Sequence, residues 1–467
     1  MQKNQERISV VSTLGMNGEG ILKDNNETVF VPYALAGEKI KYKLVKCSSK
    51  ANYGKLLEVF TPAEDRVRPP CKVFTKCGGC QLQHLKYEKQ LKFKENKIAT
   101  CFLKIANLDV NVSKTVCGDS EFRYRNKLQL PVGQAEDGVV VGFYAENSHR
   151  IVPILDCEIN AKWTANLISA LKKYMAKFSL RGYDEKTRSG DVREITAKEI
   201  NGNLLITLVI SKDSIRNVDE FIKILSQEIN LPFSLYLNVN KSDTNLIYGD
   251  KFIKVYGESE YQAEMLGIKY KIGVRSFSQV NTVVCEKLYA TVKDLIKMDA
   301  NTTVIDAYSG AGLMTCIIAK DVKKVVGIEI IKEAVEIANE LKNENELGDV
   351  VTNYHGKCEE LLPKIVKNLK QNDEEIAVIL DPPRKGCEYP VIKALIDANV
   401  DKIVYVSCNP STLARDVGLL VGSLVKDDKG ISRADNYEAR YQIDCVKPFD
   451  MFAQTKHVET LVSLTKR

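Results

Sequence analysis

The chain has 467 residues, of which 44% are hydrophobic and 27% charged, a composition that excludes disordered and fibrous proteins. Its length predicts about three domains. No run reaches the ~18 apolar residues of a membrane helix, and the polar start does not resemble a signal peptide. We therefore expect a cytoplasmic protein with no membrane partner.

Charge and cysteine content narrow the function further. Lys and Arg number 67 and Asp and Glu 61, a net charge of +6, but residues 41–130 alone carry a surplus of 11 basic over acidic residues. Such a field favours a nucleic-acid partner over a merely solvated lysine-rich surface. The 13 cysteines, an odd number without a secretion signal, argue against a disulfide framework. Some of these thiols should bind a metal or take part in chemistry.

Residues 1–60 contain five short strand-like runs separated by Gly and Asn. This pattern predicts a small closed β-barrel of the oligonucleotide-binding kind. The runs are 7–14, 18–23, 28–35, 38–49 and 53–60. Pro62, Pro69 and Pro70, mixed with charged residues, predict a linker after this first domain.

Residues 61–274 predict a mixed α+β domain. Helices are expected at 87–106 and 163–178, and strands at 126–133, 139–144, 203–211 and 234–239. The segment FRYRNK (122–127) alternates basic and aromatic residues, a combination that neutralises phosphates and stacks unpaired bases. We interpret it as an RNA contact, and a solvated strand face is the alternative.

Three cysteines of this region fall within ten residues. Cys71, Cys77 and Cys80 are followed much later by Cys157, and thiols in this pattern can close around one metal centre. Spacing alone leaves zinc and a 4Fe–4S cluster open, because both take four thiolates. Four unrelated buried thiols are the remaining alternative.

Residues 275–467 alternate apolar strand runs with helical segments, a pattern that predicts a doubly wound parallel sheet. The strand runs are 303–310, 324–330, 349–356, 376–383 and 402–409. Ligands of such sheets bind at the carboxyl ends of the strands. The remaining motifs fall at those ends.

The segment TVIDAYSGAGLMT (303–315) is a strand followed by a glycine turn and a helix start. Gly310 and Gly312 allow a ligand to approach the backbone closely. The next strand run ends near Glu329, where an acid can hold a ribose. The pair predicts a nucleoside ligand and leaves NAD and S-adenosylmethionine both open.

The segment IAVILDPPRKG (376–386) ends a strand in Asp381 and two prolines, which fix the backbone where a base can dock. Methyltransferases that act on exocyclic amines usually place an aromatic residue after such prolines. Arg384 stands there instead. Amine methylation is therefore disfavoured, and another atom of the base is the expected target.

A cysteine follows the last strand run of this series. Cys408 lies in the turn of SCNPSTLARD (407–416), at an edge where this fold places its active sites. A thiolate adds readily to carbon-6 of uracil and so makes carbon-5 nucleophilic. Loss of the carbon-5 proton then requires a base, and Glu459 in the segment 455–464 is our candidate. A buried structural cysteine is the alternative for Cys408, and an exposed strand carboxylate is the alternative for Glu459.

Together these segments resemble the RNA uracil-5-methyltransferase family over essentially the whole chain. SFSQVN (276–281), DAYSGAG, Glu329, DPPRKG, SCNPSTLARD and the terminal HVET occur in the family's order. The chain looks like the bacterial 23S ribosomal RNA branch, and its amino-terminal barrel is similar to a TRAM domain. The expected domains are 1–60, an RNA-binding TRAM-like barrel, 61–274, an iron–sulfur domain with an RNA-binding surface, and 275–467, a Rossmann-like methyltransferase domain.

The resemblance also implies roles for individual residues. By that likeness Gln279, Tyr308, Glu329 and Asp381 contact S-adenosylmethionine, Cys408 is the nucleophile and Glu459 the proton acceptor. Cys71, Cys77, Cys80 and Cys157 would hold a 4Fe–4S cluster. The implied partner is 23S ribosomal RNA, with no obligate protein partner. Transfer RNA is the alternative substrate, and a non-catalytic iron–sulfur RNA-binding factor is the alternative function.

Overall fold

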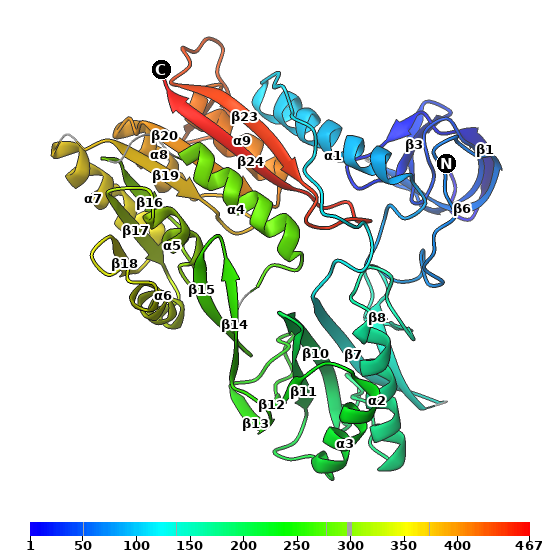
Figure 1. The fold of residues 1–467 in the computed structure, drawn as a ribbon. Coiled ribbons are helices and arrows are strands. Elements are labelled where there is room, and N and C mark those ends of the chain that lie inside the picture. Colours follow the sequence, from blue (N-terminus) through cyan, green and yellow to red (C-terminus); the bar gives the residue numbers. More distant parts are fainter. Residues whose placement is uncertain (50, 137, 277, 297–300, 373) are drawn as a thin grey trace. The chain divides into compact units, whose positions relative to one another are not determined.

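The protein, described by a computed structural model, folds into two compact units (Figure 1). The structure describes residues 1–467 apart from 50, 137, 277, 297–300 and 373, so Phe277 of the SFSQVN segment lies outside the described residues. The first unit comprises Met1–Gln90, Ser120–Tyr261 and Phe452–Lys456, and the second comprises Leu91–Asp119, Gln262–Met451 and His457–Arg467. The division into three domains at residues 60 and 274 stays a prediction.

The amino-terminal sheet of the first unit curls around a small apolar core. Its strands are β1 (Glu6–Val10), β2 (Thr13–Leu14), β3 (Gly20–Asp24), β4 (Glu27–Val31), β5 (Lys39–Lys46) and β6 (Asn52–Thr61), in the order β1-β5-β6-β4-β3-β2. Alternate residues of β5 point inward, so Ile40, Tyr42 and Leu44 join the core. The predicted strand over 7–14 is thus divided into β1 and β2.

The second sheet of this unit has seven strands in the order β13-β12-β11-β10-β7-β8-β9. They are β7 (Lys127–Ala135), β8 (Gly138–Tyr144), β9 (Ile151–Pro153), β10 (Val192–Ile200), β11 (Asn203–Ile210), β12 (Phe233–Val239) and β13 (Lys251–Tyr256). β11 and β12 are parallel and are joined by helix α3 (Val218–Glu228), beside which lies α2 (Trp163–Lys177) (Figure 1). All of β12 is buried, as is typical of a strand covered on both faces.

The second unit is built on a seven-stranded sheet in the order β18-β17-β16-β19-β20-β24-β23. Its strands are β16 (Thr303–Asp306), β17 (Lys324–Glu329), β18 (Val351–His355), β19 (Ile376–Leu380), β20 (Lys402–Ser407), β23 (Tyr441–Phe449) and β24 (Glu459–Lys466). β16 to β20 are parallel, and β24 runs antiparallel to both of its neighbours. The chain winds to one side from β16 and to the other from β19, so the switch point of the sheet lies between these two strands.

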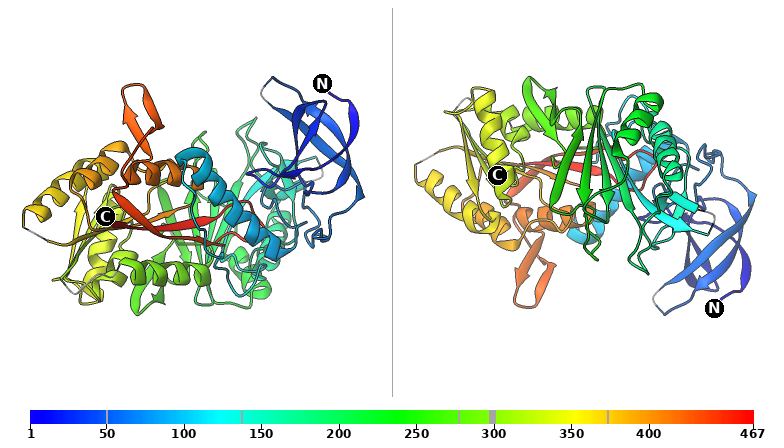
Figure 2. Two further views of the ribbon diagram at one scale, coloured as in Figure 1. Left: turned by 90° about the horizontal axis from the view of Figure 1, so that it is seen from above. Right: turned by 90° about the horizontal axis from the view of Figure 1, so that it is seen from below.

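Helices cover both faces of this sheet, with α4 on one side and α8 and α9 on the other (Figure 2). They are α4 (Thr282–Ile296), α5 (Leu313–Ala319), α6 (Lys332–Glu344), α7 (Cys358–Gln371), α8 (Tyr389–Asp397) and α9 (Pro410–Val421). The predicted doubly wound α/β architecture is therefore confirmed. Two short ribbons accompany it: β14 (Glu260–Met265) with β15 (Ile268–Gly273), and β21 (Leu424–Asp427) with β22 (Gly430–Arg433).

Helix α1 (Tyr87–Cys101) continues into a π-helical turn, η1 (Phe102–Ala106), over the predicted helical segment. Within the second unit, Lys94 of α1 and Asp450, which follows β23, form a fully buried ion pair. The Thr115 N–H also donates to Glu95 at 2.9 Å. These bonds hold α1 from Leu91 onward in the second unit, because breaking the pair would leave an unpaired charge in the interior. None of the described helices is both long enough and apolar enough to cross a bilayer.

His84 is buried in the first unit against aromatic rings. It is 1% exposed, and its ring centroid lies 5.6 Å from that of Phe74 and 6.0 Å from that of Tyr33. Neither ring nitrogen has a hydrogen-bond partner among the described residues. Burial, together with the charge of Arg66, lowers the pKa of His84 to about 3. The imidazole is therefore neutral in the folded protein.

We expect the first unit to lose stability as the pH falls below the ordinary histidine pKa. In the unfolded chain His84 takes up a proton near its ordinary pKa, whereas in the folded chain it stays neutral until the pH reaches about 3. Over one and a half pH units this difference lowers the free energy of unfolding by about 2 kcal/mol. In urea unfolding at pH 6.5 and at pH 5, His84→Phe should remove this part of the pH dependence. His149→Gln, which changes an exposed histidine, is the control and should retain it.

Candidate active site

The first predicted residues lie where β16 and β17 end. Asp306, the last residue of β16, is 2% exposed and accepts a hydrogen bond of 2.6 Å from Thr315 Oγ1. Burial raises the pKa of Asp306 to about 6. Glu329, the last residue of β17, accepts the N–H groups of Gly310 at 3.0 Å and Ile331 at 2.8 Å. The glycine turn and the acid are thus bonded to each other.

Gly310 leaves room for a ligand at this turn. Its φ of 54° lies in the left-handed region that favours glycine. A Cβ at this position would have open space around it. At Gly312, by contrast, a Cβ would lie 2.8 Å from Cβ of Ala338, so this glycine serves the packing of α5 on α6. Glycine is therefore needed at the two positions of this motif for different reasons: space for a ligand at Gly310 and close helix packing at Gly312.

Tyr308 and Gln279, the other two residues predicted to contact the methyl donor, have different surroundings. The Tyr308 hydroxyl shares hydrogen bonds with the thiols of Cys358 and Cys387, and burial holds its pKa above the usual range. That hydroxyl is therefore already engaged within the protein. Gln279 is half-buried in the segment that precedes α4.

Asp381 follows β19, across the switch point from Asp306. Burial raises the pKa of Asp381 to about 7, and the charge of Asp306 adds to the effect, yet the residue is also exposed to water. The raised pKa and the exposure to water are both expected of a carboxyl group that is surrounded by protein on most sides and open to solvent on one. Two perturbed carboxyls therefore flank the switch point, where ligands of this fold bind.

Cys408 lies in a fixed turn directly after the buried strand β20. The next residue, Asn409, caps α9 by accepting the Ser411 N–H at 3.1 Å, and Pro410 occupies the first helical position. Cys408 itself is half-buried. The strand end and the cap together hold its thiol at the carboxyl edge of the sheet.

Strand register brings Glu459 to the same place. In the antiparallel pair of β20 and β24, Ser407 stands opposite Thr460, so the next two positions, Cys408 and Glu459, meet at the strand ends. Glu459 is 7% exposed, and burial raises its pKa to about 8, with Asp381 adding to the effect. Burial also raises the pKa of the Cys408 thiol, and the Glu459 charge raises it further.

Arg384 opposes these shifts. Its side chain hydrogen-bonds Cys408, and its charge lowers the pKa values of both Cys408 and Glu459. The Arg384 carbonyl accepts Asn409 Nδ2 at 3.0 Å and Thr412 Oγ1 at 3.3 Å, which ties the Pro-Pro segment to the Cys408 turn. The sequence singles out Arg384 only as the residue that replaces an aromatic. Its contact with the thiol depends on two loops that no local motif relates.

Asp416 of α9 holds the Pro-Pro segment from the other side. It is fully buried and accepts the Cys387 N–H at 2.9 Å and the Tyr405 hydroxyl at 2.6 Å. The neighbouring Arg415 donates to Asp416 and to the carbonyl of Lys385. A buried carboxylate with this many donors is a rigid support. Sequence reasoning missed Asp416.

Two side chains of α4 complete the surroundings. Cys285 and Tyr289 hydrogen-bond each other, and the charge of Asp381 acts on the pKa of both. Their spacing of four residues places them on one face of the helix. That spacing is the only sequence signal for them, and a packed helix gives the same signal.

We expect Arg384→Gln to slow the alkylation of Cys408 by iodoacetamide several-fold at pH 8. Without the guanidinium the pKa of the thiol rises, and only the thiolate reacts. Peptide mass spectrometry separates Cys408 from the other cysteines. Lys385→Gln removes an adjacent, exposed charge that pairs with Glu388 and should leave the rate unchanged. Equal rates in the two variants would contradict the contact.

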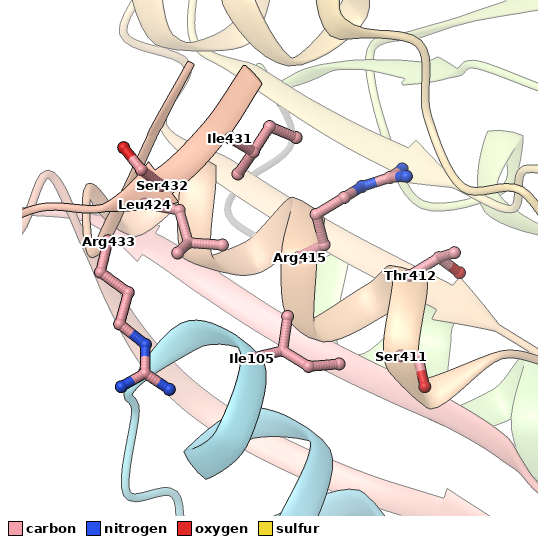
Figure 3. A pocket seen from close by; sticks show the side chains of 8 residues that line it. All are labelled: Ile105, Ser411, Thr412, Arg415, Leu424, Ile431, Ser432 and Arg433. Carbon is pink, nitrogen blue, oxygen red and sulfur yellow. The ribbon is translucent and has the colours of Figure 1, made fainter. Parts of the chain in front are cut away.

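A recess of about 360 Å³ lies beside α9 (Figure 3). Apolar side chains from η1 and the β21–β22 ribbon line it together with hydroxyls and guanidinium groups. The lining residues are Ile105, Ser411, Thr412, Arg415, Leu424, Ile431, Ser432 and Arg433. None of them is a predicted donor-binding or catalytic residue. The recess adjoins the site, because Ser411, Thr412 and Arg415 of α9 also bond to the Cys408 turn and the Pro-Pro segment.

The four cysteines predicted to hold a cluster lie near one another in the first unit. Burial raises the pKa of Cys80 to about 12 and of Cys157 to about 11, and the thiols of Cys71 and Cys77 add to both shifts. Among the described residues, however, no group of three or more His, Cys, Asp or Glu side chains is arranged to hold a metal ion. The structure therefore does not support the iron–sulfur centre predicted for residues 61–274.

Two side chains of the basic–aromatic segment 122–127 bond to other parts of the first unit. Arg123 pairs with Asp156 and Glu158, both at 2.8 Å, and donates to the Cys157 carbonyl at 2.9 Å. The Tyr124 hydroxyl donates to the carbonyl of Ala453. That this segment contacts RNA phosphates stays a prediction, although Arg123 already has two carboxylate partners. Its observed role is to hold the turn that carries Cys157.

Comparisons with known proteins agree with the geometry of the second unit. Residues 86–467 match the family model described as tRNA (uracil-5-)-methyltransferase. A protein of Clostridium tetani named as an uncharacterized RNA methyltransferase is 36% identical, with 100% of this chain and 97% of that one aligned. A namesake from Listeria monocytogenes is 34% identical over 99% of this chain and 98% of its own.

Among solved structures, the Pyrococcus abyssi tRNA (uracil-54, C5)-methyltransferase in complex with S-adenosyl-L-homocysteine is similar. It has a TM-score of 0.75 and 25% sequence identity, and the match covers 98% of this chain and 100% of that one. The similarity thus extends through both units of the protein. Family model, relatives and structure agree, and the chain belongs to the family of RNA uracil-5-methyltransferases.

Proposed function

We propose that this RNA methyltransferase transfers a methyl group from S-adenosylmethionine to carbon-5 of a uridine. The carrying observation is the meeting of Cys408, Glu459 and Arg384 at the carboxyl end of β20 and the amino end of β24, which is antiparallel to it. A thiol, a carboxyl with a raised pKa and a guanidinium supply a nucleophile, a base and a charge that favours the thiolate. This set matches what methylation of an unactivated pyrimidine carbon requires.

We propose Gln279, Tyr308, Glu329 and Asp381 as the residues that hold the methyl donor. The Glu329 carboxylate uses one lone pair of each oxygen for the N–H groups of Gly310 and Ile331, and about two lone pairs remain for ribose hydroxyls. The open space beside Gly310 supports the same assignment. The Tyr308 hydroxyl is engaged with two thiols, so its ring rather than its hydroxyl would contact the donor.

The proposed reaction proceeds in three steps on the RNA base. The Cys408 thiolate forms a bond to carbon-6, and the electrons of the carbon-5–carbon-6 double bond move into an enolate at carbon-4. When bound, S-adenosylmethionine would supply an electrophilic methyl group to carbon-5, and the electron pair of the broken methyl–sulfur bond would remain on the sulfur of the donor. Glu459 then accepts the carbon-5 proton, and the thiolate leaves carbon-6 as the double bond returns. The target uridine must leave its stack to reach the thiol.

The proposed substrate is 23S ribosomal RNA, with transfer RNA as the second candidate. The resemblance of the sequence to the ribosomal RNA branch supports the first. The solved Pyrococcus abyssi structure, a tRNA (uracil-54, C5)-methyltransferase, supports the second. Mapping 5-methyluridine in both RNAs, from cells with and without the gene, decides between them. If both RNAs kept all of their 5-methyluridine in cells without the gene, the proposed function would be contradicted. Either RNA substrate implies a cytoplasmic protein.

We retain the 4Fe–4S cluster at Cys71, Cys77, Cys80 and Cys157 as a proposal. Its support is the four-thiol donor set and the mutual electrostatic influence of these side chains. We expect anaerobically purified protein to be brown and to contain about four iron atoms per chain. Cys77→Ser should remove the colour, whereas Cys47→Ser, in the amino-terminal sheet region, should retain it. A colourless protein with bound zinc or no metal would contradict the proposal.

A further inference from the structure

A basic pocket of about 610 Å³ lies in the first unit, at one edge of the seven-stranded sheet of that unit. Five cationic side chains line it: Arg181, Arg188, Arg193, Lys212 and Lys241. Asp243 is the single acidic residue of the lining. We call this feature the basic pocket. It shares no residue with the proposed active site, and it lies outside the segment 41–130 whose charge surplus the sequence reveals.

The topology explains why cations gather at this edge. β11 and β12 are parallel and joined by α3, so their carboxyl ends lie side by side, and loops at such ends form ligand sites in other parallel sheets. Lys212 follows β11, and Lys241 follows β12. The connection from α2 to β10 contributes Arg181 and Arg188 from the other side. Three separate loops thus converge with the same sign of charge.

Arg193 is held in place before any ligand arrives. Its Nη1 donates to the carbonyls of Asn240 at 3.1 Å and Ser242 at 2.5 Å, and its guanidinium lies 4.3 Å from the ring centroid of Tyr183. Asn240 is 1% exposed, so the loop that accepts these bonds is itself anchored. A guanidinium fixed in this way loses little side-chain entropy on binding an anion.

The carboxylates nearby do not cancel the charge. Arg188 pairs with Asp243 at 3.1 Å, Lys212 with Asp191 at 2.7 Å, and Lys241 with Asp213 at 2.6 Å. The cations of these pairs are all more than half exposed, and exposed pairs contribute only about 0–1 kcal/mol. Arg181 is exposed. A multivalent anion can therefore compete for these cations at little cost.

We propose that the basic pocket binds backbone phosphates of the RNA substrate. This inference rests on the proposed function for the identity of the polyanion. Several cations beside an aromatic ring suit an RNA strand, whose phosphates and unpaired bases need both. The pocket takes the role predicted for the segment 122–127, whose Arg123 is instead engaged with Asp156 and Glu158.

The test is the salt dependence of RNA binding by the full-length chain without methyl donor. Unmodified transcripts of transfer RNA and of a 23S ribosomal RNA fragment serve as probes in filter binding between about 50 and 200 mM salt. Arg181→Gln/Arg188→Gln should weaken binding of the substrate transcript roughly tenfold and lower the slope of log K against log salt by about 2. Both side chains are exposed, so folding is expected to persist.

The matched control is Lys173→Gln/Lys254→Gln, which removes two exposed charges of the same unit outside the pocket. An affinity and slope equal to those of the control would overturn the proposal. A second outcome would also overturn the proposal. In it, the wild-type protein binds inorganic phosphate saturably at constant ionic strength, and the arginine variant loses this binding but keeps its affinity for RNA. RNA binding requires no methyl transfer. If the protein made no 5-methyluridine but the arginine variant still lost RNA affinity as predicted, only the proposed function would be contradicted.

Discussion

Replacing Cys408 with alanine is expected to abolish methyl transfer to RNA, with a loss of at least about 10⁴-fold. Carbon-5 of uracil is a poor nucleophile until a thiolate adds to carbon-6, and alanine offers nothing that can add. The half-buried thiol hydrogen-bonds Arg384, and Glu459 stands at the adjoining strand end. Transfer of labelled methyl groups from S-adenosylmethionine to unmodified transcript measures the loss.

The control for this result separates chemistry from binding. Cys408→Ala should keep its affinity for S-adenosylmethionine and for RNA within about twofold, because the thiol forms its bond only during the reaction. Cys445→Ala changes another half-buried cysteine of the same sheet and should retain full activity. Turnover retained by Cys408→Ala would exclude covalent catalysis by this residue. Loss of donor binding would instead indicate a structural role.

The motifs that follow parallel strands could be located from the sequence because position along a strand is a local property. The runs that end in Asp306, Glu329, Asp381 and Cys408 were each predicted to stop at the carboxyl edge, and the structure has them there. Parallel strands share that edge, so their ends converge without further information. The order in which the strands lie was not needed to expect a single site.

Glu459 depended on a different kind of information. Its meeting with Cys408 is set by the register of the antiparallel pair β20 and β24, and a slip of one residue would turn every side chain of β24 to the other face. β23, the neighbour on the far side of β24, has no counterpart among the strands predicted from the sequence. The assignment of Glu459 therefore came from resemblance, and its geometry became visible only in the fold.

Side chains that act through distant partners were not predictable from local patterns. Asp416 supports the Pro-Pro segment from α9, and nothing in the sequence around it distinguishes it from a solvated helix carboxylate. Arg123 shows the converse: alternation with aromatics suggested RNA, but two carboxylates from another loop engage it. Whether a basic side chain can bind RNA depends on the residues that surround it in the fold. The composition of a segment does not reveal those residues.

Replacing Glu459 with glutamine is expected to trap the enzyme on its substrate. The amide cannot accept the carbon-5 proton, so methyl transfer proceeds but the methylated base stays bonded to Cys408. A covalent protein–RNA complex should then persist in a denaturing gel, and turnover should fall by about 10²–10⁴-fold. Glu340→Gln, an exposed carboxyl of α6, is the control and should show neither effect.

The pH dependence identifies the base independently of the trapped complex. Burial raises the pKa of Glu459 to about 8, so below that pH the fraction able to accept a proton falls about tenfold per unit. Decay of the preformed methylated adduct should therefore slow as the pH falls from 8 to 6 in the wild-type protein and level off above 8. Cys408 is already bonded to the base at this stage, so its own ionisation does not enter. The adduct of the Glu459→Gln variant should decay slowly at every pH. If it decayed at the wild-type rate, another group would accept the proton. Asp381, whose pKa is raised to about 7, would then be the alternative base.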